Sequence, residues 1–397
     1  MKSPLRLTSR AIIVDDPRRD ARFAHDRATG RQWALGDTAM RVMYEASTGD
    51  GFRPRLRPMF AAQQTVVKAM RAAGMLARSS SSTAGTFRRP TTMLSRVFAE
   101  ITAQCNLRCA HCYGDFNIQR RERLSLEQIE VLASEAARIG VYEFDLTGGE
   151  ALLHPDFPEI LEILEANGML TTVFTNLTHV PPRVRDSITA RGVTKLITSI
   201  ESVDPRTHDS FRGLEGAHRR TLKYAQVFKD GGIRVIVNVV AGQHNVATVP
   251  QTVEFLTRRG LAVTVDLISE CGRALAGSGV TGTQAVALRA DLLRLPAYRE
   301  RRSEGCGVGS RLLFVTASGD LTLCPSLRAG PFRVGTIHAP FDLGSVARRV
   351  ASVGDIRCAT MCPVIDICAG GCRAEALRLR GSLTAPDPSR CEYYGVL

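Results

Sequence analysis

The sequence of 397 residues predicts an α/β fold, placed between a small N-terminal α+β unit and a cysteine-rich C-terminal segment. Strand-like and helix-like segments alternate six times between Leu94 and Ser269, which favours a parallel sheet with helices outside it. A serine-rich stretch separates this region from the residues before it. Seven of the eleven cysteines lie between residues 306 and 391, so the C-terminal segment is expected to bind metal.

Residues 1–77 are expected to form the N-terminal unit. Its predicted strands are 11–14, 21–25 and 31–35, with a turn at 28–30, and its predicted helices begin at Gly36 and cover 61–73. Strands with two or three helices in about eighty residues are typical of a winged helix. Residues 78–92 are rich in serine, threonine and glycine, which predicts a linker and a domain boundary.

Residues 93–275 are expected to form the α/β domain. The predicted strands are 95–102, 142–147, 170–175, 194–200, 233–240 and 262–268, and helices are expected at 126–139, 158–167, 217–230 and 249–259. In parallel barrels the catalytic residues lie at the carboxyl ends of the strands. We therefore expect the functional residues to follow these strands.

Cys105, Cys109 and Cys112 follow the first strand with the spacing C-x3-C-x2-C. A structural zinc loop needs four ligands, and a [4Fe-4S] cluster that only carries electrons takes four cysteines. Three cysteines on one loop suit a [4Fe-4S] cluster with one iron left open. The stretch resembles the signature of the radical S-adenosylmethionine (SAM) enzymes, in which SAM binds the open iron. The resemblance implies a partial (β/α)6 barrel, cleavage of SAM to a 5′-deoxyadenosyl radical, and a reductant such as flavodoxin or ferredoxin.

The same resemblance assigns SAM contacts to residues at the strand ends. Gly148, Gly149 and Glu150 resemble the motif that contacts the SAM amino group, and two glycines let the backbone approach a ligand. Ser199 and Arg212 match positions that hold the SAM carboxylate, to which a guanidinium is suited. The other expected contacts are Glu201 and Asn238 at the ribose, His111 near the adenine, and Asn176 at the end of the third strand. Asn238 is equally consistent with a structural role, since a buried polar group needs a partner.

The cysteines of residues 300–397 are consistent with zinc knuckles, but their pattern resembles the SPASM domain, which holds two auxiliary [4Fe-4S] clusters. The resemblance assigns Cys306, Cys324 and Cys372 to the first cluster and Cys358, Cys362, Cys368 and Cys391 to the second. SPASM domains usually have C-x2-C where Cys358 and Cys362 are separated by three residues. Two clusters need eight ligands and the segment offers seven. We expect Cys271 to be a small buried apolar residue, which leaves one iron position open; the alternative is that Cys271 is the eighth ligand.

The net charge of +13 is concentrated at the N-terminus, because residues 1–90 hold 17 Lys+Arg and 7 Asp+Glu. An acidic partner is therefore expected there. The layout of residues 1–77 resembles a PqqD-like peptide-recognition element, which implies binding of a precursor-peptide leader as an added strand. The alternatives are a DNA-binding winged helix and a degenerate packing domain, and the enzyme context argues against a nucleic-acid partner. The sequence lacks an apolar run of about 18 residues and a signal-peptide core, so we expect a cytoplasmic protein without a membrane partner.

Together these features predict a radical SAM/SPASM enzyme that modifies a ribosomally made precursor peptide with an acidic leader, by a thioether or carbon–carbon cross-link. An anaerobic sulfatase maturase normally has Asp after the second SPASM cysteine, whereas Pro325 follows Cys324 here. A tetrapyrrole-modifying enzyme would leave the N-terminal unit unexplained. An iron–sulfur electron carrier would leave the three-cysteine loop unexplained.

Overall fold

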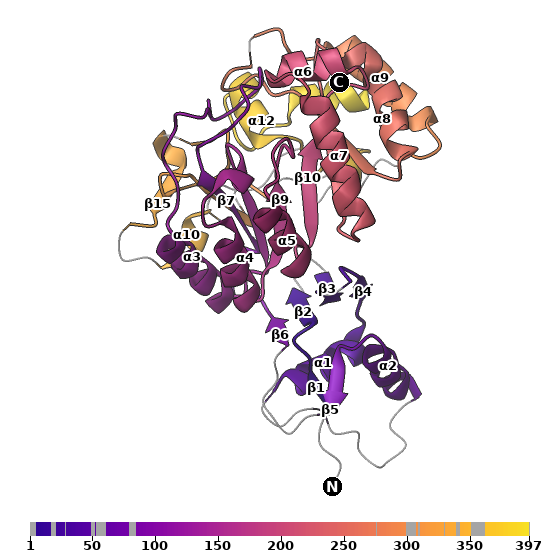
Figure 1. Ribbon diagram of the computed structural model, residues 1–397, viewed down its shortest axis with the longest axis vertical. Helices are drawn as coiled ribbons and strands as arrows, with labels where there is room; N and C mark the ends of the chain where they lie inside the picture. Colours follow the sequence, from indigo (N-terminus) through magenta and orange to yellow (C-terminus); the bar gives the residue numbers. More distant parts are fainter. Residues whose placement is uncertain are drawn as a thin grey trace.

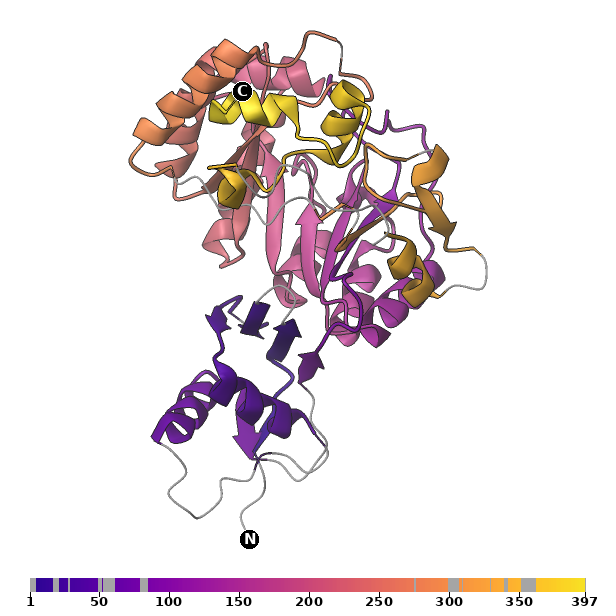
Figure 2. The same cartoon turned by 180° about the vertical axis from the view of Figure 1, so that it is seen from behind.

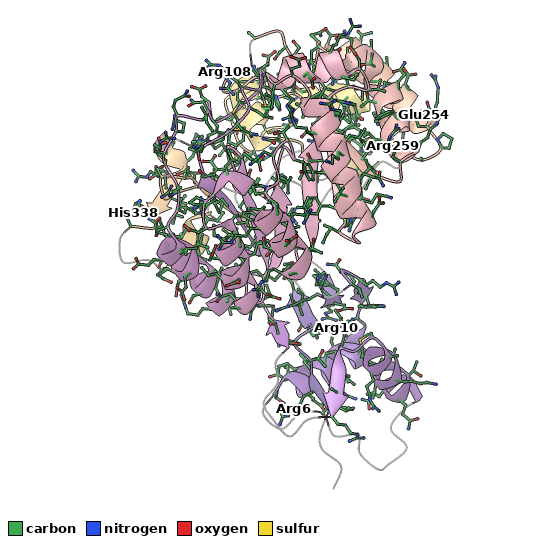
Figure 3. All side chains as sticks on the ribbon, in the orientation of Figure 1. Arg6, Arg10, Arg108, Glu254, Arg259 and His338 are labelled. Atoms are coloured by element: carbon green, nitrogen blue, oxygen red, sulfur yellow. The ribbon has the colours of Figure 1, made fainter. Side chains whose placement is uncertain are left out.

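The structure is a computed structural model that describes residues 5–16, 21–27, 29–48, 52, 61–78, 85–274, 276–298, 307–308, 310–328, 330–338, 342–350 and 362–396. Over these residues the molecule is elongated, with a small N-terminal unit at one end and a larger α/β body at the other (Figure 1). Arg6 of the N-terminal unit and Arg108 of the α/β body lie toward opposite ends (Figure 3).

The N-terminal unit combines two small sheets with helices. Its described elements are β1 (Leu5–Leu7), β2 (Ala11–Asp16), β3 (Ala21–Asp26), β4 (Gln32–Ala34), α1 (Asp37–Ser47), α2 (Ala61–Ala72), β5 (Leu76–Arg78) and β6 (Thr86–Arg88). β1 pairs with β5, and the larger sheet has the order β4-β3-β2-β6. Val42 and Met43 of α1 pack against Leu5, Ile13 and Met75 in the core of this unit. The predicted strands and helices are confirmed; the predicted turn includes Ala28, which lies outside the described residues.

The predicted linker, residues 78–92, is partly structured. Arg78 ends β5, and β6 pairs in parallel with β2, with Phe87 opposite Ile13. The N-terminal sheet therefore extends eleven residues beyond the predicted end of the domain at residue 77. Serine-rich composition predicted a boundary, but the pairing partner of β6 lies far upstream, where local composition gives no signal. Residues 79–84 lie outside the described part of the chain.

The α/β body begins with six parallel strands in sequential order, as the alternation predicts. They are β7 (Arg96–Thr102), β8 (Glu143–Gly148), β9 (Leu170–Phe174), β10 (Lys195–Ser199), β11 (Val235–Ala241) and β12 (Ala262–Leu267). The helices between them are α3 (Leu126–Arg138), α4 (Phe157–Ala166), α5 (Pro182–Ala190), α6 (Pro205–Arg212), α7 (Ala217–Asp230) and α8 (Val249–Thr257), with short 3-10 turns η2 (Ala151–Leu153) and η3 (Val246–Thr248).

The body is held together by one large apolar core between the strands and the outer helices. Ser125 begins α3 with a capping box that Gln128 completes, and the helix then buries Ile129 and Leu132 against the sheet. Phe144 of β8 lies in the same core and is fully buried. The described sheet is open, because β12 is an edge strand, so the fold is a partial barrel.

The C-terminal unit continues the barrel sheet instead of forming a separate sheet. Its elements are α9 (Gly282–Arg294), β13 (Leu312–Val315), β14 (Asp320–Thr322), η4 (Gly330–Phe332), β15 (Arg333–Thr336), α10 (Leu343–Val350), α11 (Ile365–Cys368), α12 (Arg373–Arg380) and α13 (Pro388–Tyr394). β13 pairs in parallel with β7, and β14 and β15 follow antiparallel. The last helices cross the end of the sheet to which the parallel strands point (Figure 2).

The N-terminal unit is fastened to the opposite end of the barrel, where the parallel strands begin. Ile12 and Val14 of β2 form an apolar cluster with Tyr142 and Leu170, which lie at the start of β8 and β9. Phe23 meets Tyr142 edge-on, with 6.1 Å between the ring centroids. This shared apolar cluster fixes the N-terminal sheet against the barrel.

Candidate active site

Three cysteines lie on the loop that follows β7, which we call the cysteine loop (residues 103–116). Cys105 and Cys109 are buried and Cys112 is half-buried, and all three belong to one cluster with Leu107 and Phe116. None of the three forms a disulfide. The structure therefore brings the predicted ligands together at the carboxyl end of the first parallel strand.

The backbone of the cysteine loop is fastened to the end of α6. The N–H of Ala110 donates to the carbonyl of Phe211 over 2.9 Å, and the N–H of Arg108 donates to the carbonyl of Arg212 over 3.3 Å. Gly213 ends the helix with φ +70°, and a Cβ there would lie 2.8 Å from the carbonyl oxygen of Arg108. Only glycine satisfies both conditions without strain.

Burial makes thiolates costly on this loop. It raises the pKa of Cys105 to about 12 and also raises the pKa of Cys109, and the neighbouring thiols add repulsion. Nη1 of Arg212 lies 3.6 Å from Sγ of Cys109 and opposes this rise. Metal ligation requires thiolates, and iron supplies the positive charge that a buried set of three thiolates lacks. The donor set therefore fits an iron–sulfur cluster.

Gly148 and Gly149, at the end of β8, lie against the backbone where the cysteine loop begins. A Cβ on Gly148, where φ is +149°, would lie 2.2 Å from the carbonyl oxygen of Thr102, and one on Gly149 would lie 2.3 Å from that of Gln104. The N–H of Gly149 donates to Thr102 over 2.7 Å, and that of Glu150 donates to Gln104 over 2.8 Å. The glycine pair therefore lets β8 approach the loop backbone, in addition to the SAM contact that was predicted.

Glu150 is buried and connects the ends of β8 and β9. Its carboxylate accepts hydrogen bonds from the hydroxyl of Thr175 (2.6 Å) and the N–H of Asn176 (2.7 Å). The side chain of Asn176 donates to Oδ1 of Asn106 on the cysteine loop over 2.9 Å. Burial raises the pKa of Glu150, and the hydrogen bonds oppose the rise. Both residues support the loop, while their SAM contacts stay predictions.

Glu201 and Arg212, predicted to contact different parts of SAM, form a buried ion pair with each other. The second oxygen of Glu201 accepts from the N–H of Val240 over 3.0 Å. Burial raises the pKa of Glu201, and the guanidinium opposes the rise. Nε of Arg212 is buried and has no hydrogen-bond partner among the described residues. One N–H of Arg212 is thus left for an additional acceptor.

Polar side chains form a row across neighbouring strands inside the barrel. Ser199 of β10 is opposite Asn238 of β11, which is opposite Thr264 of β12. The hydroxyl of Thr264 donates to Oδ1 of Asn238 over 3.1 Å, so Asn238 has a structural partner as well as its predicted ribose contact. Ser199 ends β10, whereas Asn238 and Thr264 lie within β11 and β12, and the SAM contacts of Ser199 and Asn238 stay predictions.

His111 stacks within a group of three rings from three segments. Its ring lies 4.8 Å from that of Phe211, and His244 stacks on the other side of Phe211 at 3.7 Å. Burial lowers the pKa of His111 well below its ordinary value, and the nearby Arg212 adds to the shift. The side chain of His111 is thus a neutral ring in a stack, and its contact with the adenine of SAM stays a prediction.

A second buried ion pair beside the loop was missed by the sequence reasoning. Oε2 of Glu100 accepts from Arg328 over 2.8 Å and from the N–H of Ala317 over 3.3 Å. The guanidinium of Arg328 lies 5.7 Å from the ring of Tyr113 and 5.9 Å from that of Phe116. A glutamate inside the apolar run of β7 was the available signal, since a buried carboxylate needs a partner.

The predicted auxiliary ligands within the described residues lie just after β14 and in or beside the last helices. Cys324 is buried after β14, Cys368 ends α11, Cys372 precedes α12 and Cys391 lies in α13. Cys362 is half-buried, and Cys306 and Cys358 lie outside the described residues. Among the described residues no three His, Cys, Asp or Glu side chains converge as ligands of a single metal ion.

Asp387 connects two of these segments. Its carboxylate accepts from the N–H of Cys372 over 2.8 Å, and its carbonyl accepts from the N–H of Cys391 over 3.0 Å. Burial raises the pKa of Asp387, and the N–H of Cys372 opposes the rise.

The described part of the chain contains no helix that is both long and apolar enough to span a membrane.

Comparison with known proteins identifies the central domain. Residues 99–256 match the radical SAM superfamily. The AdoMet-dependent heme synthase of Methanosarcina barkeri is 26% identical over 329 residues, which cover 73% of this chain and 94% of that protein. The PqqA peptide cyclase of Xanthomonas axonopodis pv. citri is 23% identical over 330 residues, which cover 74% of this chain and 86% of that protein.

A solved structure shares the overall fold. The structure of Streptococcus suis SuiB bound to the precursor peptide SuiA superimposes with a TM-score of 0.65 at 13% identity, covering 96% of this chain and 98% of that chain. This likeness extends beyond the matched domain and supports the partial barrel. Residues 99–256 are therefore a radical SAM domain.

Proposed function

We propose that this enzyme modifies a ribosomally made precursor peptide, by forming a thioether or a carbon–carbon cross-link. The observation that carries the proposal is a free sheet edge in the N-terminal unit, next to a basic cavity against the barrel. The similarity to the PqqA peptide cyclase and to the fold of SuiB supports it. When bound, a [4Fe-4S] cluster and SAM supply a 5′-deoxyadenosyl radical that abstracts hydrogen; the protein supplies orientation and exclusion of water.

In this proposal the cysteine loop holds the SAM-binding cluster. Cys105, Cys109 and Cys112 are its ligands, and the unpartnered Nε of Arg212 is placed to receive the SAM carboxylate. The other residues are proposed to contact three further parts of SAM. The amino group would be contacted by Gly148, Gly149 and Glu150, the carboxylate and ribose by Ser199, Glu201 and Asn238, and the adenine by His111, and Asn176 would support these residues. Replacing all three loop cysteines by Ala should abolish formation of 5′-deoxyadenosine. Cleavage at the normal rate would refute the assignment.

The N-terminal unit is proposed to be a PqqD-like element that binds the leader as an added strand on β4. β4 is an edge strand of its sheet, so one side of its backbone is free within the described residues. Gln32 and Ala34 of β4 line a cavity of about 460 Å³ between this sheet and the barrel, while Trp33 packs against the core of the unit. An extended peptide can pair with such an edge while its side chains enter the cavity.

The cavity carries positive charge that suits an acidic leader. Lys195 and Arg234 line its barrel side, and neither forms a salt bridge within the described residues. Glu143 also lines the cavity, but Arg96 pairs with it at 3.0 Å. Two uncompensated cations beside a free strand edge therefore attract an acidic strand.

The Lys195→Glu/Arg234→Glu variant tests this proposal. We expect binding of an acidic leader, taken from a short reading frame beside the gene, to weaken by about tenfold, with a reduced salt dependence. SAM cleavage without peptide should be unchanged, because both residues lie at the end of the barrel away from the cysteine loop. Arg258→Glu on α8 is the matched control and should not affect binding. Equal affinities of all three proteins would contradict the leader site.

Point variants test the leader site more directly than deletion of the N-terminal unit does. Tyr142 and Leu170 of the barrel are buried partly by β2, so deletion would expose apolar surface and affect folding. The charge reversals leave this apolar contact in place.

We further propose two auxiliary [4Fe-4S] clusters in the C-terminal unit. Their ligands would be Cys306, Cys324 and Cys372 for the first, and Cys358, Cys362, Cys368 and Cys391 for the second. The variant without the three loop cysteines should keep about eight iron atoms per chain, two four-iron clusters. Iron near zero in this folded variant would refute the auxiliary clusters. A flavodoxin or ferredoxin is the proposed reductant.

The similarity to the heme synthase supports a second candidate, in which the substrate is a tetrapyrrole. The N-terminal unit then has no role in the reaction. Anaerobic incubation of the reduced enzyme with SAM and either a precursor peptide or a heme precursor separates the candidates by mass spectrometry of the products. The charge-reversal variant should affect only the peptide reaction.

A further inference from the structure

Cys271 was expected in an apolar core, but it lies beside the turn that follows Cys324. The residue is half-buried and belongs to none of the apolar clusters of the described residues. Its Sγ lies 3.7 Å from the hydroxyl of Ser326. Ser326 is part of the tight turn that joins Cys324 to Leu327. The thiol of Cys271 is thus placed next to the segment that carries Cys324.

The segment around Cys271 is fixed on one side by the cysteine loop. Gly272 has φ +62°, and a Cβ there would lie 2.3 Å from the carbonyl oxygen of Cys112. The N–H of Arg273 donates to the same carbonyl over 2.9 Å, and its Nε donates to the carbonyl of Cys109 over 3.0 Å. The backbone that follows Cys271 therefore has little freedom to move.

On its other side the segment contacts the helix that begins after Cys372. The hydroxyl of Ser269 donates to Glu375, which lies in the first turn of α12. Glu270 lies 3.6 Å from Arg378 of the same helix. Cys372 is the N-cap of α12, so Ser269 is held near the start of that helix and Glu270 near its end.

We propose that Cys271 is a ligand of the first auxiliary cluster, together with Cys324 and Cys372. The inference rests on the proposed auxiliary clusters. Three chain segments with these cysteines meet: the one after β12, the turn after β14 and the start of α12. Eight cysteines remain outside the cysteine loop, which is the number that two four-iron clusters require.

Such a site differs from one for a single ion. Three side chains that bind one ion must converge on a point, and no described set does so. A four-iron cluster takes each ligand on a different iron, so its thiols are spread around a larger body. The arrangement of Cys271, Cys324 and Cys372 on three surrounding segments is consistent with a cluster. A ligand from the barrel would also fix the position of the auxiliary cluster relative to the cysteine loop.

The test uses the full-length chain with Cys105, Cys109 and Cys112 replaced by Ala, so that only auxiliary iron is counted. Adding Cys271→Ala should lower iron from about eight to seven or fewer per chain and produce the electron paramagnetic resonance signal of a three-iron cluster or the loss of one cluster. Ser326→Ala, which removes only the neighbour of the thiol, is the matched control and should change neither readout. Unchanged iron and an unchanged spectrum in the Cys271 variant would overturn the inference.

A second measurement uses the wild-type chain, so its result does not depend on whether a variant folds. In the iron-loaded wild-type chain, a half-buried free thiol reacts with iodoacetamide, whereas a thiolate bound to iron is protected. We expect Cys271 to be unlabelled in the loaded protein and labelled after the iron is removed by a chelator. Full labelling of Cys271 while auxiliary iron stays in place would overturn the inference but leave the proposed clusters intact. Absence of auxiliary iron would overturn both.

Discussion

Replacing Arg328 by Met should leave a carboxylate buried without its cation. Glu100 is fully buried, and it also accepts a hydrogen bond from the N–H of Ala317 at 3.3 Å. Methionine keeps most of the volume of the arginine stem and its contact with the rings of Tyr113 and Phe116. The change therefore removes mainly the charge and the hydrogen bond to Glu100.

The size of the effect follows from the burial of the two partners. Loss of one member of a fully buried pair costs about 3–5 kcal/mol. Because the Arg328 side chain is 30% exposed, we reduce this to about 2 kcal/mol, which corresponds to a fall in the unfolding midpoint of about 2–3 °C for a chain of this length. Burial raises the pKa of Glu100, and Arg328 opposes the rise. Without Arg328 the folded protein favours protonated Glu100, so the deficit should be smaller at pH 5 than at pH 8.

The assay is thermal unfolding of four proteins: wild type, Arg328→Met, Glu100→Gln and the double variant. Removal of both charges leaves no buried ion, so the double variant should regain most of the stability lost in Arg328→Met. Arg333→Met is the control, since Arg333 pairs with Asp320 at the surface and should lose less than about 1 kcal/mol. A double variant as unstable as Arg328→Met would refute the argument.

Three further outcomes are expected. Gly149→Ala should displace the cysteine loop, because the new Cβ would lie 2.3 Å from a loop carbonyl. We expect the iron bound by the loop to decrease and SAM cleavage to slow at least about tenfold. Gly36→Ala, whose new Cβ would meet no atom within 4 Å, should change neither. Burial lowers the pKa of His208 to about 2, so the folded state loses stability as pH falls below about 6.5. His208 also accepts the N–H of Glu201, so the test is the pH dependence: between pH 7.5 and pH 5, His208→Asn should gain about 2 kcal/mol relative to wild type, measured by urea unfolding. Ser199→Ala should weaken SAM binding about fivefold by titration calorimetry, and the exposed Ser210→Ala should not; equal affinities would remove Ser199 from the site.

The repeating part of the fold was predictable because its signal is local. Each parallel strand is a short apolar run, and each following helix places apolar residues at helical spacing, so the predicted bounds agree with the structure within about two residues. The predicted helix 217–230 and the observed α7 have the same bounds. The cysteine loop was equally accessible, since its three ligands lie within eight residues of one another.

Pairings between distant segments were not predictable from the sequence. β6 was predicted as linker because its partner, β2, lies more than seventy residues away. Cys271 was expected to be buried, but its surroundings are set by α12 and by the turn after β14, both far along the chain. The SAM motifs identified Glu201 and Arg212 but not their ion pair, since a family pattern gives positions and not contacts.

Three arginines from separate elements hold the cysteine loop in place. Arg212 at the end of α6 contacts the thiol of Cys109, Arg273 after β12 binds two loop carbonyls, and Arg328 of the C-terminal unit pairs with Glu100 beside the loop. Arg212 brings its positive charge next to the thiol of Cys109, which lowers the cost of forming a thiolate there. Because the three arginines are far apart in sequence, the loop reaches its shape only after the barrel and the C-terminal unit have packed together. A loop fixed in this way is preorganised for iron, so less ordering is left to be done when the cluster binds.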